Sequence, residues 1–404
     1  MISVEAARER ILSAFAALAS EQVSLAAALG RVLAKDVKAR VTQPPAAVSA
    51  MDGYAVRAAD VAKVPASLRV VGMAPAGGAY GKALRPGEAV RIFTGAPLPE
   101  GADAIVIQED TSLAGDEVTV REAAPPGHYV RPAGLDFSAG EVGLGHGRVL
   151  GPREIGLAAA MNVPWLRVRR RPRVAILATG DEVVMPGDPV GPNQIVSSNA
   201  LALAAAITAW GGEPVSLGIA LDTKESLQTL AAGAANADLL LTTGGASVGD
   251  FDLVQEALME RGLAVDFWQI AMRPGKPLIF GRLGATPLIG LPGNPVSSLV
   301  CAIIFVRPAM ARMLGLKIGD SGLASARLGS ALKANDRRQD YLRARLAQAA
   351  DGELVATPFP VQDSSNLSRL TNADCLIIRP PGAPPAAAGE RVTILPLDAA
   401  LRAL

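Results

Sequence analysis

Residues 241–252 read LTTGGASVGDFD, and this stretch decides the fold of the middle of the chain. Its apolar start predicts the end of a buried strand, the glycines predict a turn, and a helical pattern begins directly after them. Glycines let backbone N–H groups approach a phosphate, and the N-terminus of a helix adds partial positive charge. The loop is neither a Walker loop nor a GxGxxG motif, so a plain tight turn explains the glycine spacing equally well.

Strand and helix patterns alternate around this stretch, from residue 173 to residue 325. Asn199 is the expected N-cap of one helix, and Pro295 begins the last one. Such alternation predicts a parallel sheet with helices on both faces, which is a doubly wound α/β domain. Ligands then belong at the carboxyl ends of the strands. The expected strands are 173–177, 214–219, 238–241, 265–270, 278–280 and 287–289, and the expected helices are 199–210, 224–235 and 253–261.

Three further loops leave the same predicted sheet edge. The loop at 272–277 places Arg273 and Lys276 around a rigid Pro-Gly turn. Surface cations are more often simply solvated, but the flanking prolines and the glycine weaken that interpretation here. The loop at 291–295 feeds the N-terminus of a helix, and the loop at 178–182 ends in an acidic corner. Together the loops predict an anionic, phosphate-bearing ligand.

Two carboxylates, Asp250 and Asp252, follow the glycine loop. N-capping of the next helix explains one of them without any ligand. Beside a phosphate loop, two carboxylates also suit Mg²⁺, a hard cation that prefers oxygen ligands. The loop therefore predicts a metal ion next to the phosphate.

The rest of the chain has a different character. A helical pattern covers 4–18, short strands with Gly/Pro turns fill 51–139, and 140–172 is a connector. Residues 326–404 return to short strands and predict a small β barrel or sandwich. The fold class is therefore multidomain α/β and β. The predicted domains are 1–45 together with 140–172, then 46–139, 173–325 and 326–404.

Composition excludes several classes of protein. Lys plus Arg number 39 and Asp plus Glu 38, so the chain lacks the basic surplus of a nucleic-acid binder. Two histidines do not support a His-rich metal site, and Cys301 and Cys375 are expected as buried, reduced core residues. No apolar run reaches the roughly 18–20 residues that span a bilayer. The N-terminus lacks the apolar core of a signal peptide, so a cytoplasmic protein without membrane contact is expected.

Six separated motifs carry a family resemblance. In order and spacing they resemble the molybdopterin molybdenumtransferase family, which is called MoeA in bacteria and forms the E domain of gephyrin in animals. Asp52 and Gly53 alone would be an ordinary turn signal, so the resemblance adds weight to this position. The motifs are SAMDGYAVR at 49–57, RIFTGAPLPEGADAIV at 91–106, LATGDE at 177–182, TTGGASVGDFD at 242–252, RPGKP at 273–277 and GLPGNPVS at 290–297.

The resemblance implies a homodimer of four-domain subunits, with a MogA/MoaB-like third domain and a C-terminal β barrel. It implies adenylylated molybdopterin and molybdate as substrates, Mg²⁺ as the divalent cation, and molybdenum cofactor plus AMP as products. Transient contacts with molybdopterin adenylyltransferase and apo-molybdoenzymes are also implied. The implied catalytic residues are Asp52, Thr94, Asp136 and Glu182, the metal ligands are Asp252 and Glu182, and the substrate-binding residues are Asp222, Thr243, Gly244, Gly245, Ser247, Arg273, Lys276, Pro292, Gly293 and Asn294. Arg338 and Ser365 match loosely.

The resemblance also suggests a division of roles. Arg273 and Lys276 would hold molybdate near the dithiolene, Mg²⁺ on Asp252 and Glu182 would polarise the bridging phosphate, and Asp52 would position a water or the metal. Arg273 stands where a lysine is common in the family. The planar guanidinium of arginine differs from the compact ammonium of lysine, so the contact with molybdate or phosphate is altered. Leu135 replaces a usual glutamate beside Asp136, and Ala246 replaces a usual valine, which is a packing change.

Two rival functions remain. An adenylyltransferase acting one step earlier would share the α/β domain, but the SAMDGYAVR module and the C-terminal barrel disfavour it. A scaffold that anchors receptors is suggested by the animal homologue, but a long disordered linker and a second fused domain are missing from this chain.

Overall fold

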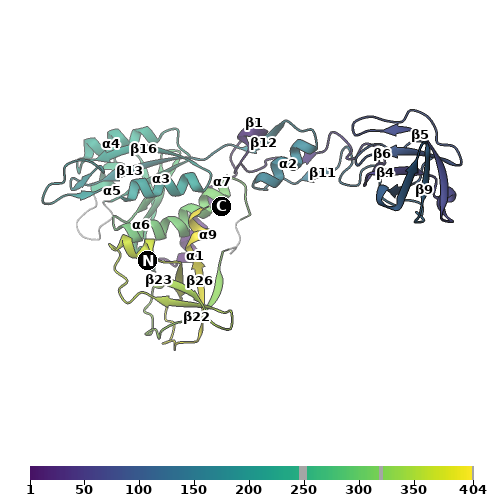
Figure 1. Cartoon of the computed structure of the whole chain (residues 1–404). Coiled ribbons are helices and arrows are strands. Elements are labelled where there is room, and N and C mark those ends of the chain that lie inside the picture. The colour runs from purple at the N-terminus through teal and green to yellow at the C-terminus, as the bar shows by residue number, and fades with distance from the viewer. Residues whose placement is uncertain (245–252, 318–321, 403–404) are drawn as a thin grey trace. The chain divides into compact units, whose positions relative to one another are not determined.

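The computed structural model describes residues 1–244, 253–317 and 322–402 of the chain (Figure 1). The chain divides into two compact units. The major unit consists of residues 1–21, 30–34 and 168–404, and the minor unit consists of residues 22–29 and 35–167. The finer boundaries of the four predicted domains stay a prediction.

A mixed six-stranded sheet forms the centre of the α/β part of the major unit, in the order β16-β13-β17-β21-β20-β18. β16, β13, β17 and β21 are parallel, as predicted, but β20 runs antiparallel to both neighbours. The prediction of an all-parallel sheet was wrong because the short turn between β20 and β21 leaves no room for a crossover helix. The strands are β13 (Arg173–Thr179), β16 (Glu213–Ala220), β17 (Leu239–Thr243), β18 (Leu263–Gln269), β20 (Pro277–Leu283) and β21 (Thr286–Leu291).

Helices cover both faces of this sheet, which confirms the doubly wound arrangement (Figure 1). Strand residues alternate between the faces, so Val174 and Ile176 pack into one apolar core and Ala175 and Leu177 into the other. α3 and α6 belong to the first core, and α4 and α5 belong to the second. The helices are α3 (Asn199–Ala209), α4 (Lys224–Ala231), α5 (Leu253–Met259) and α6 (Pro295–Cys301).

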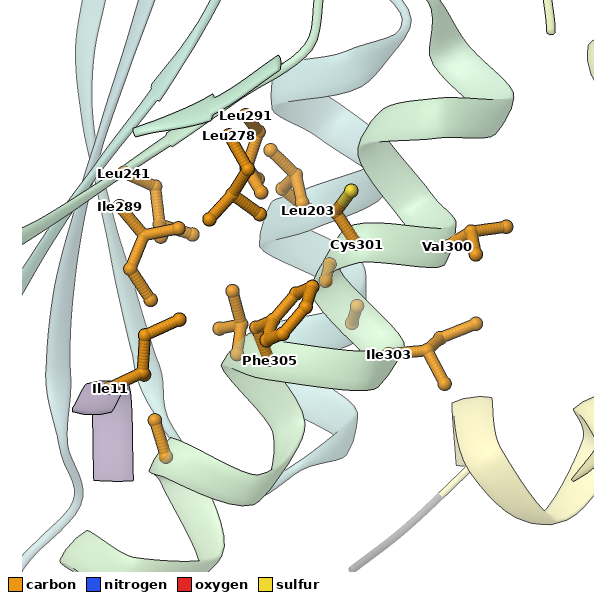
Figure 2. Close-up of a cluster of buried hydrophobic side chains, with 14 of the residues drawn as sticks. Ile11, Leu203, Leu241, Leu278, Ile289, Leu291, Val300, Cys301, Ile303 and Phe305 are labelled. Atoms are coloured by element: carbon orange, nitrogen blue, oxygen red, sulfur yellow. The ribbon is translucent and has the colours of Figure 1, made fainter. Parts of the chain in front are cut away.

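Figure 2 shows part of the first core, where Leu241 and Ile289 of the sheet face Cys301 and Phe305. Ile11 of α1 (Val4–Ser13) joins the same core. This helix is shorter than the predicted 4–18, because the chain leaves it and the Leu18 N–H donates to the Met313 carbonyl at 2.8 Å. Both cysteines are buried and free, as predicted.

One helical run, residues 295–313, is long and apolar enough to cross a membrane by length and composition alone. It is longer than any apolar run expected from the sequence, because helix α6 continues into the π-helical segment Ala302–Val306 and then α7 (Arg307–Met313). Pro308 has no N–H to offer within the helix, which accounts for the local change of hydrogen bonding. Since 72% of the apolar window is buried, the run is a core helix.

The C-terminal strands close into a five-stranded barrel, in the order β23-β24-β22-β26-β25 with β25 paired back to β23. This confirms the predicted barrel. β19 (Met272–Arg273) pairs with β23 in parallel, so the loop that carries Lys276 begins at the barrel. The remaining bounds are β22 (Ala324–Leu328), β23 (Gln339–Gln348), β24 (Leu354–Pro358), α8 (Leu367–Thr371), β25 (Cys375–Arg379), β26 (Arg391–Pro396) and α9 (Leu397–Arg402).

The minor unit contains a six-stranded sheet in the order β7-β4-β6-β5-β9-β8, which confirms the predicted β module. All neighbours are antiparallel except β5 and β6. Its strands are β4 (Gly53–Val56), β5 (Ala66–Ala74), β6 (Glu88–Ile92), β7 (Ala104–Ile107), β8 (Thr111–Ala114) and β9 (Glu117–Val120).

Short elements complete the chain. The two-stranded sheets are β1 (Ser20–Ser24) with β12 (Trp165–Arg169), β2 (Val37–Lys38) with β11 (Val142–Leu144), β3 (Val48–Ser49) with β10 (Val130–Arg131), and β14 (Val183–Val184) with β15 (Ile195–Val196). Helix α2 (Pro152–Ala160) lies in the predicted connector, and short 3-10 helices occur at Leu25–Ala27, Ala58–Val61, Gln108–Asp110 and Ala232–Ala234.

Candidate functional site

A cavity of about 900 Å³ opens at the edge of the α/β sheet where the parallel strands end. Thr179 ends β13, Thr243 ends β17, and Pro292 follows β21, and all three residues line it. Parallel strands direct their carboxyl ends to one edge, which is why loops distant in sequence meet here. Lys276 also lines the cavity, from the connection between β18 and β20.

The glycine loops pack backbone against backbone. Gly244 has φ +102°, and a Cβ atom there would lie 2.4 Å from the Thr179 carbonyl oxygen. A Cβ atom at Gly293 would lie 3.6 Å from the Gly244 Cα. Gly244 is therefore required for the close approach of two loops, in addition to any contact with a ligand.

Asn199 joins these loops and does not cap its helix, so the sequence prediction for this residue was wrong. Ser198 occupies the N-cap position of α3. The Asn199 amide Nδ2 donates to Thr243 Oγ1 at 2.9 Å and to the Gly293 carbonyl at 2.7 Å. A side-chain amide carries two donor hydrogens, so one residue can satisfy acceptors from two loops.

The hydroxyl of Thr179 lacks a hydrogen-bond partner among the described residues. Its side chain belongs to a residue that is only 2% exposed, at the wall of the cavity. A buried polar group without a partner costs free energy, so a ligand oxygen is a natural partner for it. This observation fits the predicted phosphate site.

Lys276 is held on a tightly packed loop. Gly275 has φ +110°, and a Cβ atom there would lie 2.4 Å from Cys301 Sγ, so the loop rests directly on α6. The Ile270 N–H donates to the Lys276 carbonyl at 3.0 Å. Among the described residues, no ion pair neutralises the Lys276 ammonium. Burial raises the pKa of the Cys301 thiol, which makes Cys301 a packing residue and not a nucleophile.

Arg273 lines the same cavity, but its guanidinium is bound to the barrel. Nε donates to Asp340 Oδ1 at 2.8 Å, and Nη2 donates to Asp340 Oδ2 at 2.6 Å. Asp340 is only 6% exposed, and this bidentate pair raises the pKa of Arg273. Arg273 therefore differs from Lys276, although the sequence placed the two cations side by side.

A loop of the barrel forms another wall of the cavity. Asn294 Nδ2 donates to Ser364 Oγ at 2.8 Å, and the Val296 N–H donates to the Ser364 carbonyl at 3.1 Å. Asp363 Oδ1 accepts from the Ser365 hydroxyl at 2.6 Å and from its N–H at 2.8 Å, and these bonds lower the pKa of Asp363. Asp363 and Ser364 were not found from the sequence, because a polar loop without periodicity carries no signal.

The loosely matched residues Arg338 and Ser365 both line the cavity. Arg338 Nη2 donates to Asp336 Oδ2 at 2.9 Å. This bond and a second one from the Arg338 backbone N–H are the main reasons why the pKa of Asp336 is lowered to about 2. Pro292, Gly293 and Asn294 line the cavity as well.

The acidic residues predicted for the site in the major unit do not all lie on the cavity. Glu182 lines the cavity, whereas Asp222 is not among the described lining residues. The Asp222 N–H donates to Asp181 Oδ1 at 2.9 Å, and the Asp181 N–H donates to Asp222 Oδ2 at 3.4 Å, so Asp222 braces the corner before Glu182. Gly245, Ser247 and Asp252 lie outside the described residues. Within the described residues, no group of three or more metal-ligating side chains gathers.

In the minor unit, Asp52 and Thr94 meet at one end of the sheet. Asp52 precedes β4 and Thr94 follows β6, and these strands pair Gly53 with Ile92. The Thr94 N–H donates to Asp52 Oδ1 at 2.7 Å, and the Thr94 hydroxyl donates to the same atom at 2.8 Å. These two bonds, with the charge of Arg91, lower the pKa of Asp52. The antiparallel register thus builds an exposed, ionised carboxylate, which we call the Asp52 corner.

Asp136 lines a separate cavity of about 700 Å³ in the minor unit. Gly95, the residue after Thr94, lines it too, together with Arg131 and Leu135. The structure therefore places the Thr94 loop and Asp136 around one hollow of the minor unit, and Leu135 contributes an exposed apolar side chain there.

Three family models match the chain. Residues 2–162 match "MoeA N-terminal region (domain I and II)". Residues 175–312 match "Probable molybdopterin binding domain", and residues 325–397 match "MoeA C-terminal region (domain IV)". The cavity lies in the second match, with one wall from the third, and the Asp52 corner lies in the first.

Curated relatives and solved structures agree with these matches. The molybdopterin molybdenumtransferase of Nostoc sp. (strain PCC 7120) is 38% identical over 94% of this chain and 89% of its own length. That of Haemophilus influenzae is 33% identical over 98% of this chain and 99% of its own. Crystal structures of two molybdopterin biosynthesis MoeA proteins from Pyrococcus horikoshii superpose with TM-scores of 0.86 and 0.83, at 33% and 26% identity. Each match covers 98% of this chain, and 99% and 100% of the respective structure.

Proposed function

The chain belongs to the MoeA family, and on that basis we propose that it acts as a molybdopterin molybdenumtransferase in molybdenum cofactor biosynthesis. In this reaction, molybdate enters the dithiolene of adenylylated molybdopterin, and AMP leaves. The observation that carries the proposal is the cavity, which is lined by Lys276, the glycine loops and the Thr179 hydroxyl, a group with no hydrogen-bond partner among the described residues.

Binding of the phosphate groups is assigned to the loops at the strand ends. The Thr179 hydroxyl is buried and has no partner in the part of the chain that the structure describes, and Ser297 is 4% exposed in the first turn of α6. Backbone N–H groups at the start of a helix attract anions through their partial positive charge. These donors suit the oxygens of a phosphate better than an apolar ligand. They support a pterin phosphate or the adenylyl phosphate as occupant.

Molybdate, a tetrahedral dianion, needs a positive group in the same cavity. Lys276 supplies it, because its ammonium is not neutralised by any of the described residues. Arg338 lines the same cavity, and the N–H groups of its guanidinium that do not bond Asp336 would add donors. Attraction between opposite charges is strong where water is partly excluded.

We propose Mg²⁺ as the divalent cation, with Glu182 as a ligand from the described residues and Asp252 as a second ligand. Carboxylate oxygens suit a hard cation, and Glu182 lies on the cavity wall. When bound, Mg²⁺ would neutralise charge on the bridging phosphate and make AMP a better leaving group. Asp181 and Asp222 then serve to fix the backbone before Glu182.

The Asp52 corner is proposed to serve the bond that breaks. Thr94 holds the Asp52 carboxylate ionised and leaves its second oxygen available to a water. A carboxylate in this state orients a water at the phosphoanhydride and accepts its proton as the P–O bond to AMP breaks. Asp136 lines the neighbouring hollow and is assigned to the same task.

Assembly and location are part of the proposal. We propose a cytoplasmic homodimer in which the Asp52 corner of one subunit serves the cavity of the other. Molybdopterin adenylyltransferase and apo-molybdoenzymes are the proposed transient partners, and neither nucleic acid nor a membrane takes part. The near balance of 39 basic and 38 acidic residues supports the exclusion of nucleic acid.

One assay tests the function. Purified protein is incubated with adenylylated molybdopterin, Mg²⁺ and a series of molybdate concentrations, and AMP release is followed. We expect AMP release to depend on molybdate and on the divalent ion. Binding of the adenylylated pterin with no effect of molybdate would contradict a transferase. Formation of the adenylylated pterin from ATP would identify an adenylyltransferase instead.

A further inference from the structure

The two cations of the cavity loop have different surroundings. Both carboxylate oxygens of Asp340 accept hydrogen bonds from Arg273, Oδ1 from Nε at 2.8 Å and Oδ2 from Nη2 at 2.6 Å. Arg273 Nη2 also donates to Asn335 Oδ1 at 3.2 Å, and Nη1 lies 3.6 Å from Asp336 Oδ2. Three barrel residues therefore surround one guanidinium.

The charge of Arg273 is cancelled where it stands. Asp340 faces it directly, and Asp336 faces both Arg273 and Arg338. Two carboxylates thus balance two guanidinium groups at this wall of the cavity. An oxyanion would feel little net attraction from that set, whereas Lys276 is unpaired among the described residues.

The ion pair of Arg273 with Asp340 belongs to a segment, residues 271–276, that also contacts the barrel and α6 through its backbone. Met272 and Arg273 pair in parallel with Gln339 and Asp340, and the Gln339 N–H donates to the Ala271 carbonyl at 2.9 Å. Two residues further on, Gly275 lies so close to Cys301 that a Cβ atom at this position would be 2.4 Å from Sγ. Lys276 follows directly, so the position of its side chain depends on how firmly the barrel holds the strand before it.

We propose that Arg273 is a positioning residue in this chain: its ion pair with Asp340 locks the loop to the barrel and so places Lys276, the group that meets the oxyanion. This inference rests on the proposed function, since the oxyanion is taken to be molybdate. Asp340 gains a role that follows from the buried bidentate geometry, and Arg273 loses the role of a direct molybdate ligand.

The two possible roles of Arg273 predict opposite signs for Asp340→Asn. If Arg273 bound molybdate directly, loss of the Asp340 charge would strengthen the positive site, and less molybdate would be needed. If Arg273 positions Lys276, the same substitution loosens the loop, and more molybdate is needed. Asp336→Asn is the matched control, because it also removes a negative charge near Arg273 but leaves the bidentate pair intact.

The experiment measures the molybdate concentration for half-maximal AMP release in Asp340→Asn, Arg273→Gln, Arg273→Lys, the Arg273→Gln/Asp340→Asn double variant and Asp336→Asn. We expect the first two and the double variant to raise this concentration by a similar factor of about tenfold, as for a lost charge-assisted contact. Asp336→Asn should leave it equal or lower. Arg273→Lys keeps the charge but not the fork, so it should resemble Arg273→Gln.

A second readout needs no molybdate. Hydrogen exchange of the amides at 270–277 should speed up in Asp340→Asn and Arg273→Gln, but not in Asp336→Asn. If this pattern appears while wild-type AMP release ignores molybdate, the proposed function is wrong and the positioning role stands. A lower molybdate requirement in Asp340→Asn overturns the inference. If Asp340→Asn fails to fold, wild-type behaviour of Arg273→Lys overturns it instead.

Discussion

The cavity of the major unit and the Asp52 corner of the minor unit hold polar groups in opposite ways. In the cavity, donors come from loops far apart in sequence, and Asn199 bridges two of them. In the Asp52 corner, one exposed carboxylate accepts two hydrogen bonds, both from Thr94. The cavity is therefore suited to binding a large anion, and the corner to acting on one bond. We infer that the two regions divide binding and chemistry between them.

The largest expected effect is that of Asp52→Ala. If the corner performs the chemistry, AMP release should slow by about a hundredfold or more, in the range found for general acid–base groups. The molybdate concentration for half-maximal release should not change, because the cavity is untouched. Steady-state kinetics measure both. Asp116→Asn, an exposed carboxylate of the same unit, is the control and should behave as wild type. A changed molybdate requirement with an unchanged rate would reverse the division of roles.

Lys276→Ala should have the next largest effect, which should fall on the molybdate concentration for half-maximal AMP release and not on the maximal rate. Loss of a charge-assisted contact of about 1.5–3 kcal/mol raises the molybdate requirement about tenfold or more. Binding of the adenylyl group, measured by calorimetry with AMP, should change less. Lys317→Ala removes an exposed lysine elsewhere in the major unit and serves as the control. An unchanged molybdate requirement with lost stability would make Lys276 a structural residue.

Asn199→Ala should have a smaller effect, spread over the cavity. The substitution leaves Thr243 Oγ1 and the Gly293 carbonyl without their donor. Of these two acceptors, Thr243 is buried, and an unpaired buried acceptor costs about 1–3 kcal/mol, so the urea midpoint of the major unit should fall and substrate binding should weaken a few-fold. Asn199→Asp keeps the volume but cannot donate, so it should resemble the alanine variant. Unchanged stability in both would show that the bridge does not hold the loops.

The smallest effect concerns pH. Thr94 keeps the pKa of Asp52 below its ordinary value of 3.8, mostly through its N–H and then its hydroxyl. Because folding favours the ionised form, the pair stabilises the protein above the pKa of the unfolded chain, and this stabilisation is lost as pH falls through the lower folded pKa. Thr94→Val removes only the hydroxyl, so the pKa of Asp52 should rise but stay below 3.8. Carboxyl NMR titration measures it, and a fall would contradict the assignment.

Local patterns predicted the loops of the site, but not the contacts between them. A strand that ends in glycine is visible in a short window, so the sequence indicated that Thr243, Gly244 and Gly293 belong at this sheet edge, and all three line the cavity. The partners of Asn199 lie 44 and 94 positions away, and a helix start looks the same whether its asparagine caps or bridges. Residue type therefore suggested a cap, and tertiary structure assigned another task.

Charge partners were equally hidden. Arg273 and Lys276 lie close together in sequence. Only the pairing of β19 with β23 distinguishes Arg273, which is neutralised by Asp340, from Lys276, which has no ion pair among the described residues. Asp340 lies 67 positions from Arg273, and nothing in its own window marks it as a partner. The antiparallel direction of β20 was not predicted for a related reason, because the alternation of strand and helix patterns shows which elements occur but not the direction in which each strand runs.

The most direct test asks whether the corner and the cavity form one site across two subunits. Asp52→Ala and Asp252→Ala proteins are purified separately, each shown to be folded and nearly inactive, then mixed so that heterodimers form. In a heterodimer of crossed subunits, one site carries both substitutions and the other carries neither. The account predicts recovery of up to about half of the wild-type AMP release per heterodimer, by the symmetry of a two-fold contact. Heterodimers that are detected by mass but release no AMP would contradict it.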